Sequence, residues 1–421
     1  MGHLSRAAFA LLVALNACAS QPASVPPAED TDAANIPVVT LAPEQEAALA
    51  DAAQLCGLVP QKYVFFAGKE AAWREACSEV GDKMLGAPDS AAQLRVLEDL
   101  LDVLYDPHAS FGANSAASPR LVPSGNDYWL DNGVVTGVRP GGAAALAGLQ
   151  FGDEVTAVDG QPLEDAIVER IRPAGVAPTP AQRAWAEHAA AAGYRDRLHS
   201  VTVRRAEGEA TLLLDGALPD TEYQPVTAEM LPGNTGYIRF NNSLGDDATV
   251  AAFDAAMDSL KGARAWILDL RDTPGGGSTD VAEPIMGRFI DAAGGYQRIR
   301  PPGAPEWVKT VSPRAPTAEG PLAVLVGHWT GSMGEGMAIG LDGLRRADVF
   351  GNDMAGLAGG VDAFTLDGSG LTVRLPTYDL AHMDGTPRYK WHPPHPVISD
   401  NGDGPDLALK AAEDWIGSFQ D

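Results

Sequence analysis

The sequence is poor in cysteine, in positive charge and in long apolar runs. Only 3 cysteines occur, and none has a histidine or a further cysteine at metal-ligand spacing nearby, so a zinc site built on them is excluded. Lys and Arg number 30 against 56 Asp and Glu, a formal net charge of −26, which argues against nucleic acid and anionic membrane surfaces as partners. Beyond residue 18 no segment is apolar enough to cross a bilayer. The remaining length predicts two or three domains.

The first residues predict export. Arg6 gives a charged start, and residues 7–15 form an apolar stretch too short to span a membrane. Residues 15–18, Leu-Asn-Ala-Cys, resemble a bacterial lipobox, which implies a signal peptide over 1–18 and lipidation of Cys18. We therefore expect a protein on the periplasmic side of the cell envelope, held by lipid at the outer membrane; the alternative is an ordinary signal peptide with an incidental cysteine. Residues 19–43, rich in Pro, Ala and acidic side chains, predict a flexible tether.

The other two cysteines are Cys56 and Cys77. An exported protein meets an oxidising compartment, so we expect a disulfide between them that joins two helices. A pair of buried free thiols is the alternative.

The chain divides into three structured regions. Residues 44–113 have the three- and four-residue apolar spacing of helices. Residues 120–217 run strand, short glycine-capped helix, turn, strand and turn, and then hold a second helix in a longer than usual segment over 165–195 and a closing pair of strands over 200–214. From residue 225 to 421, strands alternate with helices, which predicts an α/β layer fold interrupted by a Pro-rich excursion over 300–320.

Ser332 stands at the junction between an apolar run, residues 321–326, and a helix rich in small residues, 334–344. A side chain at a helix N-terminus faces unpaired backbone N–H groups and the positive end of the dipole. A nucleophile whose attack creates an oxyanion is favoured there. The alternative is a serine that only caps the helix.

Two segments carry a family resemblance. Residues 133–160 contain "A-A-A-L-A-G-L" and then "G-D-E-V-T-A-V-D-G", which is similar to the signature of a PDZ domain. They are followed by "Y-I-R-F", "L-D-L-R-D-T-P-G-G" and "T-G-S-M-G-E" in the order found in the C-terminal processing (tail-specific) proteases. The resemblance covers roughly residues 90–410 and implies a crotonase/ClpP-like α/β core with an inserted PDZ-like domain and an N-terminal helical region.

The resemblance implies that Ser332 is the nucleophile and that the oxyanion hole is formed by the backbone N–H groups of Met333 and of Gly275 or Gly276. A Pro-Gly-Gly turn after a strand can direct bare amides toward a ligand, because glycine adopts conformations closed to other residues. Taken alone, that segment also fits a plain tight turn.

The best-known members of the family use a serine/lysine dyad, and this chain departs from it. The lysine position falls on Leu357, and no lysine lies between Ser332 and Lys390. A serine hydroxyl needs a base. The tricorn-like Ser/His branch takes that base from a histidine in a "D-x-H-[TA]" motif, which Asp106, His108 and Ala109 match here. Imidazole titrates near neutrality and suits this role; a lone histidine that complements a helix dipole is the alternative.

The third member of such a triad is not evident. That branch uses a late glutamate, and the corresponding residues 393–400 contain none. Glu335, one helical turn after Ser332, is the candidate to orient His108 or a water, with Asp106 as a further candidate. The cluster of His382, His392 and His395 matches no known zinc spacing, so no metal is predicted.

The sequence therefore predicts an exported serine endopeptidase or carboxyl-terminal processing protease that acts on envelope proteins. No cofactor is expected. The PDZ-like unit would bind the polypeptide substrate by adding an extended segment to a sheet edge, and the membrane would be contacted only through the lipid anchor. One alternative is a catalytically inactive peptide-binding or scaffold lipoprotein, suggested by the missing lysine and late glutamate. Another is an esterase or amidase for small molecules.

Overall fold

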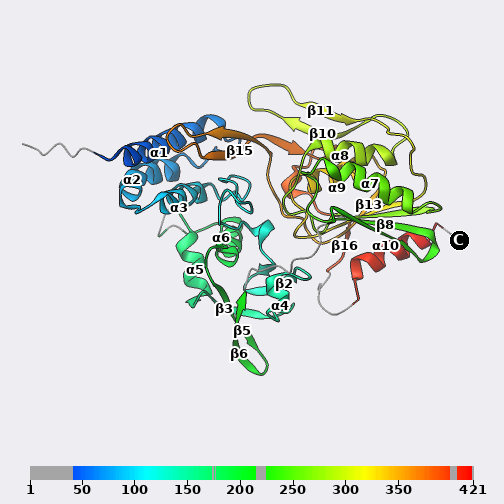
Figure 1. Cartoon of the computed structure of the whole chain (residues 1–421), viewed down its shortest axis with the longest axis horizontal. Helices are drawn as coiled ribbons and strands as arrows, with labels where there is room; N and C mark the ends of the chain where they lie inside the picture. The colour runs from blue at the N-terminus through cyan, green and yellow to red at the C-terminus, as the bar shows by residue number, and fades with distance from the viewer. Residues whose placement is uncertain (1–40, 173–174, 176, 215–223, 399–404, 420–421) are drawn as a thin grey trace, which may run out of the picture. The chain divides into compact units, whose positions relative to one another are not determined.

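The computed structural model describes residues 41–172, 175, 177–214, 224–398 and 405–419 (Figure 1). The expected signal peptide, Cys18 and nearly all of the tether lie outside the described residues. Among the helices that the structure describes, none combines the length and the apolar character needed to cross a bilayer.

The N-terminal region is helical, as expected. It consists of α1 (Pro43–Lys62), α2 (Glu70–Gly86) and α3 (Ser90–Leu101), whose apolar faces share one core. The Asp89 side chain caps α3 by accepting a hydrogen bond from Ala92 N (2.8 Å). Cys56 of α1 and Cys77 of α2 form a disulfide that links the two helices.

The next region is built on one antiparallel sheet. Its elements are β1 (Tyr128–Asp131), β2 (Val134–Val138), α4 (Ala143–Leu146), β3 (Glu154–Val158), β4 (Gln161–Pro162), α5 (Leu163–Arg170), α6 (Pro180–Ala192), β5 (His199–Arg205) and β6 (Gly208–Leu214). The strand order is β1-β2-β3-β5-β6, with β4 beside β3. The longer segment over 165–195 holds parts of two helices where one was expected, because α5 ends at Arg170 and α6 begins at Pro180, whose ring suits a first helical position.

The C-terminal core is a sheet covered on both faces. Its strands are β7 (Val226–Leu231), β8 (Thr235–Phe240), β9 (Ala265–Asp269), β12 (Leu322–Val326), β13 (Asp348–Gly351) and β16 (His395–Pro396). They lie in the order β16-β13-β12-β9-β8-β7, and all neighbours are parallel except β7 and β8. All five residues of β9 and of β12 are buried, as expected for parallel strands between two helical layers.

Helices cover the two faces of this sheet. One face packs against α7 (Ala248–Ser259), α8 (Thr279–Met286) and α9 (Met333–Gly343), and the other against α10 (Leu407–Gly417) (Figure 1). The α/β prediction is confirmed. The helix after Ser332 begins one residue earlier than expected, at Met333.

A second, antiparallel sheet has the order β11-β10-β15-β14. It is formed by β10 (Gly294–Arg300), β11 (Trp307–Val311), β14 (Gly360–Thr365) and β15 (Thr372–Ala381). The Pro-rich excursion thus contains a strand, β11, which the sequence analysis did not predict. One end of the β14–β15 hairpin packs against the helical region through Val373 and Leu375, and Figure 1 shows β15 beside α1.

Candidate active site

Ser332 lies between β12 and α9 in a strained conformation. Its backbone has φ +50° and ψ −105°, outside the regions that a serine normally occupies. Its side chain makes no capping hydrogen bond within the described chain, and the residue is partly exposed. Residues held in such conformations cluster at active sites, where the surrounding structure enforces them. The geometry therefore disfavours a serine that serves only as a helix cap.

Two loops meet at Ser332 because β9 and β12 are parallel neighbours and end at the same edge of the sheet. Thr273 and Thr330 form a parallel bridge beyond the strands. Both threonine hydroxyls donate to the Leu270 carbonyl, at 2.8 Å and 2.9 Å, and Thr273 N donates to Trp329 O (3.1 Å). The loop that follows β9 is thereby fixed against the turn that carries Ser332.

Gly276 lies directly against Ser332. A Cβ atom added at Gly276 would be 2.4 Å from Ser332 Cβ and 3.0 Å from Ser332 Oγ, and the residue has φ +64°. Both features require glycine at this position. The site is therefore shaped by a glycine whose missing side chain leaves room for the serine.

The amides expected to form the oxyanion hole differ in their contacts. Gly276 N donates to Thr273 O (3.1 Å), which closes a tight turn, and Gly275 N donates to Asn242 Oδ1 (2.8 Å). Both glycine amides thus already have acceptors. Met333 is the first residue of α9, so its N–H belongs to the groups that no intrahelical carbonyl satisfies. Of the three expected donors, the Met333 amide is the one best placed to receive an oxyanion.

Glu335 is fully buried and contacts backbone rather than His108. Its Oε2 accepts from Ser332 N (2.7 Å) and its Oε1 from Leu357 N (3.1 Å). Burial raises the pKa of Glu335 to about 7, although the Arg388 guanidinium and the backbone N–H groups oppose the shift. The carboxyl group therefore joins the Ser332 turn to the segment around Leu357. The sequence had suggested a different role, in which Glu335 orients the His108 ring.

Replacing Glu335 by glutamine is expected to lower kcat/KM at least tenfold. Glutamine offers one acceptor oxygen and an NH2 group, so the N–H of Ser332 or of Leu357 would face another donor. A buried donor without an acceptor costs about 1–3 kcal/mol, and about 1.4 kcal/mol corresponds to a tenfold effect. Steady-state kinetics checks this, with circular dichroism to establish folding. Unchanged kinetics in a folded Glu335→Gln protein would end the role assigned to Glu335.

His108 lies against the same segment. Its Nδ1 is 2.8 Å from Ala358 O. A carbonyl oxygen only accepts hydrogen bonds, so Nδ1 carries the proton and Nε2 is free to act as a base. Burial, helped by the positive charge of Arg388, lowers the pKa of His108 to about 4. The imidazole is therefore neutral at physiological pH.

Ser332 and His108 are connected through Glu335 and the segment 356–359, which we call the base loop. Leu357 N contacts Glu335 beside Ser332, and Ala358 O contacts His108. Among the described residues, no hydrogen bond joins Ser332 Oγ to the His108 ring. Catalytic hydrogen bonds are often long in unliganded sites and tighten when substrate is bound.

The base loop also contains the position at which the serine/lysine members of the family carry their lysine. Leu357 occupies the lysine position, is buried, and packs near Gly331. Lys390, the nearest lysine that follows in sequence, is exposed and lies over the Tyr389 ring, 5.5 Å from its centroid. The space beside the serine turn is therefore apolar at the position that carries an amine in the lysine-dependent relatives.

Asp106 holds the backbone of the histidine turn. Its Oδ1 accepts from His108 N (2.9 Å), and its Oδ2 accepts from Tyr63 Oη (2.8 Å). Asp106 thus fixes the backbone amide of His108. In the described structure it makes no hydrogen bond to the His108 ring.

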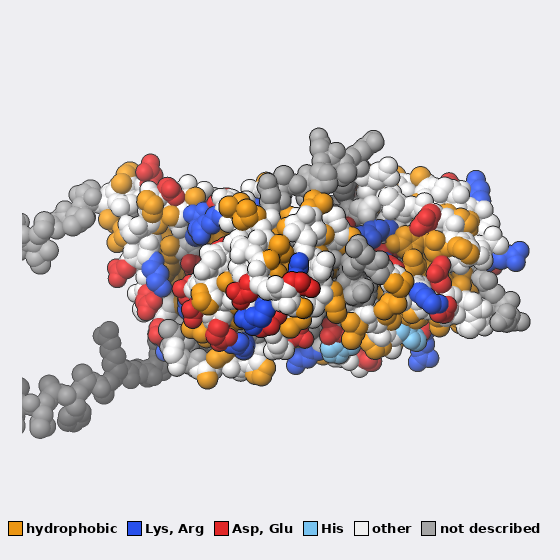
Figure 2. Space-filling model, turned by 90° about the horizontal axis from the view of Figure 1, so that it is seen from below, with side chains coloured by type: hydrophobic (Ala, Val, Ile, Leu, Met, Phe, Trp, Pro, Cys, Tyr) orange, Lys and Arg blue, Asp and Glu red, His pale blue; other side chains and the backbone are white. Residues whose placement is uncertain are grey.

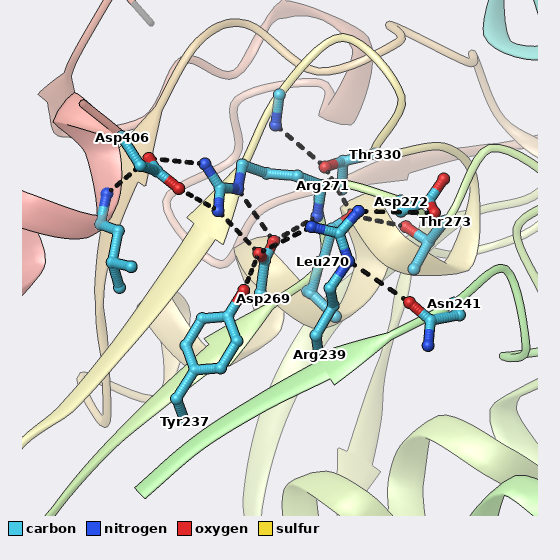
Figure 3. A network of polar contacts seen from close by, with 12 residues as sticks. Tyr237, Arg239, Asn241, Asp269, Leu270, Arg271, Asp272, Thr273, Thr330 and Asp406 are labelled. Carbon is cyan, nitrogen blue, oxygen red and sulfur yellow. Dashed lines mark hydrogen bonds and ion pairs between the residues drawn. The ribbon is translucent and has the colours of Figure 1, made fainter. Parts of the chain in front are cut away.

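A buried charge network fixes the start of the loop after β9 (Figure 3). Asp269, fully buried, accepts from Tyr237 Oη (2.5 Å) and Arg271 Nη2 (2.7 Å), and Arg271 also pairs with Asp406 (2.8 Å) at the start of α10. Burial raises the pKa of Asp269, but the guanidinium groups of Arg271 and Arg239 outweigh it and hold the pKa at about 2. The ionised carboxylate therefore anchors the end of β9, from which the Gly275–Gly276 turn extends.

The three histidines near the C-terminus do not converge. His382 contacts Asp342 and Asp384, His392 contacts Asp353, and His395 contacts Asp348, each between 2.6 and 3.0 Å. In the described part of the chain, no group of three or more His, Cys, Asp or Glu side chains is arranged to hold a metal ion. The surface in Figure 2 shows acidic and basic side chains interspersed rather than gathered into one charged patch.

Two contacts at the site could not be predicted from the sequence. Arg388 binds the base loop, and Asn242 binds Gly275. Neither residue lies in a recognisable motif, and each acts on a segment more than 25 residues away in sequence. No local pattern could have identified them.

Comparisons with known proteins relate the chain to a peptidase family and to PDZ domains. The model of peptidase family S41 matches residues 234–392, and a PDZ domain model matches residues 134–172. Carboxyl-terminal-processing peptidase 2, chloroplastic, from Arabidopsis thaliana is 30% identical over 268 residues, which cover 60% of this chain and 47% of that protein. This chain therefore spans about half the length of that curated relative.

Solved structures share the fold. The photosystem II D1 C-terminal processing protease superposes with a TM-score of 0.54 at 20% identity, over 85% of this chain and 94% of that one. Mature CPAF superposes with a TM-score of 0.57 at 14% identity, over 90% of this chain and 97% of that one. The expected α/β core, PDZ unit and N-terminal helical region are confirmed together.

Proposed function

Because the chain belongs to the C-terminal processing serine peptidases of family S41, we propose that it hydrolyses peptide bonds through Ser332 with His108 as the general base. The observation that carries the proposal is the strained Ser332 at the start of α9, packed against Gly276. No cofactor enters the reaction. The predicted signal over residues 1–18 supports action on polypeptides of the bacterial envelope.

In the proposed reaction, His108 Nε2 takes the proton from Ser332 Oγ as this oxygen attacks the scissile carbonyl. The Met333 N–H, at the positive end of the α9 dipole, stabilises the oxyanion. The imidazolium then gives its proton to the leaving amine, and a water repeats the sequence to release the acyl group. Because Ala358 O holds Nδ1–H, the same ring nitrogen serves both proton transfers.

The PDZ domain is proposed to bind the substrate polypeptide along a sheet edge. The outermost strands of its sheet are β1 and β6. Part of β1 is already engaged by α6, because His188 Nε2 lies 2.8 Å from Leu130 O. Glu187 of the same helix holds the turn that follows β1, where its Oε1 accepts from Gly133 N (2.6 Å). A peptide that joins β1 would have to displace the His188 contact.

The test offers the full chain three substrates: an unstructured polypeptide, the same polypeptide with an amidated C-terminus, and a small nitrophenyl ester. We expect polypeptide cleavage that disappears in Ser332→Ala and slows when the C-terminal carboxylate is amidated. Turnover of the ester without polypeptide cleavage would instead indicate a small-molecule hydrolase. Absence of all turnover in the folded wild-type chain would contradict the proposal.

A further inference from the structure

The His108 ring is oriented by a neutral group. In the Ser/His branch that this chain resembles, a late glutamate orients the histidine, and residues 393–398 of the described chain contain none. The acceptor of His108 Nδ1–H is instead Ala358 O, 2.8 Å away. A backbone carbonyl can hold a catalytic ring only as firmly as its own segment is held. The base loop lies outside helices and strands, so something else must fix it.

Arg388 makes the contacts that fix it. Its Nη2 donates to Leu357 O (2.7 Å) and to Gly359 O (2.9 Å), the two carbonyls on either side of Ala358. The residue is only 3% exposed, so these hydrogen bonds are shielded from competing water. Arg388 thus binds both flanking carbonyls from one side, while the Ala358 carbonyl faces His108 Nδ1 and the Gly359 backbone also interacts with the ring.

Glu335 completes the arrangement from the other side. It accepts from Leu357 N (3.1 Å) and from Ser332 N (2.7 Å), and its Oε2 lies 3.8 Å from Arg388 Nε. Above the Glu335 pKa of about 7 the two opposite charges are buried together, which reduces the cost of burying either alone. The Glu335–Arg388 pair therefore contacts both segments of the site. Glu335 accepts from Ser332 N and from the base-loop amide of Leu357, and Arg388 donates to two carbonyls of the base loop.

We infer that Arg388 is a positioning residue for catalysis, which sets the orientation of the general base His108 through the Ala358 carbonyl in place of the missing triad carboxylate. The inference rests on the proposed function of Ser332 and His108. Lysine would not fix the loop in the same way, because its ammonium rotates freely on a flexible stem, whereas the planar guanidinium fixes the direction of its N–H groups.

Arg388 also acts on His108 through its charge. The charged and titratable groups around the imidazole are Arg388 from the C-terminal core, Glu335 behind it, and Asp106 with Tyr63 on the side of the histidine turn. Burial is the main cause of the lowered pKa of His108, and the Arg388 cation lowers it further. Removing the cation should therefore raise that pKa, and the base would become protonated at a higher pH.

The test measures the rate of labelling by a fluorophosphonate probe against pH in the full chain. Wild type should lose labelling in two steps as the pH falls: through about 7, where Glu335 gains a proton beside Ser332 N and Leu357 N, and through about 4, the pKa of His108. Arg388→Met should label at least about tenfold more slowly, with both midpoints higher, that of the His108 step by about one pH unit. Arg388→Lys keeps the charge but loses the paired contacts, so its rate should fall while both midpoints stay near those of wild type. Lys390→Met, an exposed neighbour on the same turn, should match wild type in rate and in both midpoints.

The outcomes separate the two proposals. Normal wild-type labelling with an unchanged rate and unchanged midpoints in folded Arg388→Met would overturn the role of Arg388 and leave the proposed function intact. If Arg388→Met does not fold, Arg388→Lys decides: a rate equal to wild type overturns the inference, and a slower rate at unchanged midpoints supports it. A folded wild-type chain that is never labelled would contradict the proposed function, and this inference with it.

Discussion

Replacing Ser332 by alanine is expected to lower kcat/KM for peptide hydrolysis by at least about a thousandfold, because it removes the attacking oxygen. The stability of the fold should hardly change. Ser332 Oγ makes no capping hydrogen bond in the described structure, so its loss leaves no helix amide newly unsatisfied. Peptide-cleavage kinetics and urea unfolding of the same preparations check both statements.

A matched control is offered by Asp89, the N-cap of α3. Its side chain accepts from Ala92 N (2.8 Å), so Asp89→Ala should lower stability by about 1 kcal/mol and leave activity unchanged. We therefore expect Ser332→Ala to lose activity and keep its stability, and Asp89→Ala to lose stability and keep its activity. A Ser332→Ala protein that keeps more than about a tenth of wild-type activity would show that another residue attacks the substrate.

The second large effect is expected at Gly276. In Gly276→Ala the new Cβ would lie 2.4 Å from Ser332 Cβ, so the serine or its loop must move. A displacement of about 1 Å at a reacting group can cost about a hundredfold in rate, and we expect a loss of at least that size in kcat/KM. Kinetics with the polypeptide substrate measures it.

Gly303→Ala controls for the backbone cost of this change. Gly303 has φ +70°, close to the +64° of Gly276, but an added Cβ there has nothing within 4 Å. Both variants should lose comparable stability from the left-handed conformation, and only Gly276→Ala should lose activity. Equal activity in the two variants would show that the close approach to Ser332 has no catalytic importance.

Much of the nucleophile region could be predicted from the sequence, because its signals are local. The apolar run before Ser332 and the small residues after it predict a buried strand and a helix, and these lie at β12 and α9. The run of three glycines after β9 likewise predicts a turn whose backbone can approach a neighbour. Periodicity and glycine placement act over a few residues, so a single sequence carries them.

The surroundings of the base could not be predicted in the same way. Glu335 was expected near His108, yet its carboxylate binds Ser332 N and Leu357 N, a choice made by tertiary packing. Arg388 has no motif, and its partners lie about 30 residues upstream in a loop without regular structure. The strand β11 was missed because prolines on both sides of Trp307–Val311 favour loop, while pairing with β10 stabilises a strand between them.

Fluorophosphonate labelling of the full chain, followed by mass spectrometry of its peptides, tests directly whether Ser332 is the nucleophile and His108 its base. We expect one adduct, on the peptide that contains Ser332, and a labelling rate that falls by at least about a hundredfold in His108→Ala. An adduct on another residue would contradict the assignment of the nucleophile. Labelling of Ser332 at an undiminished rate in His108→Ala would contradict the assignment of the base and make Lys390 the next residue to replace.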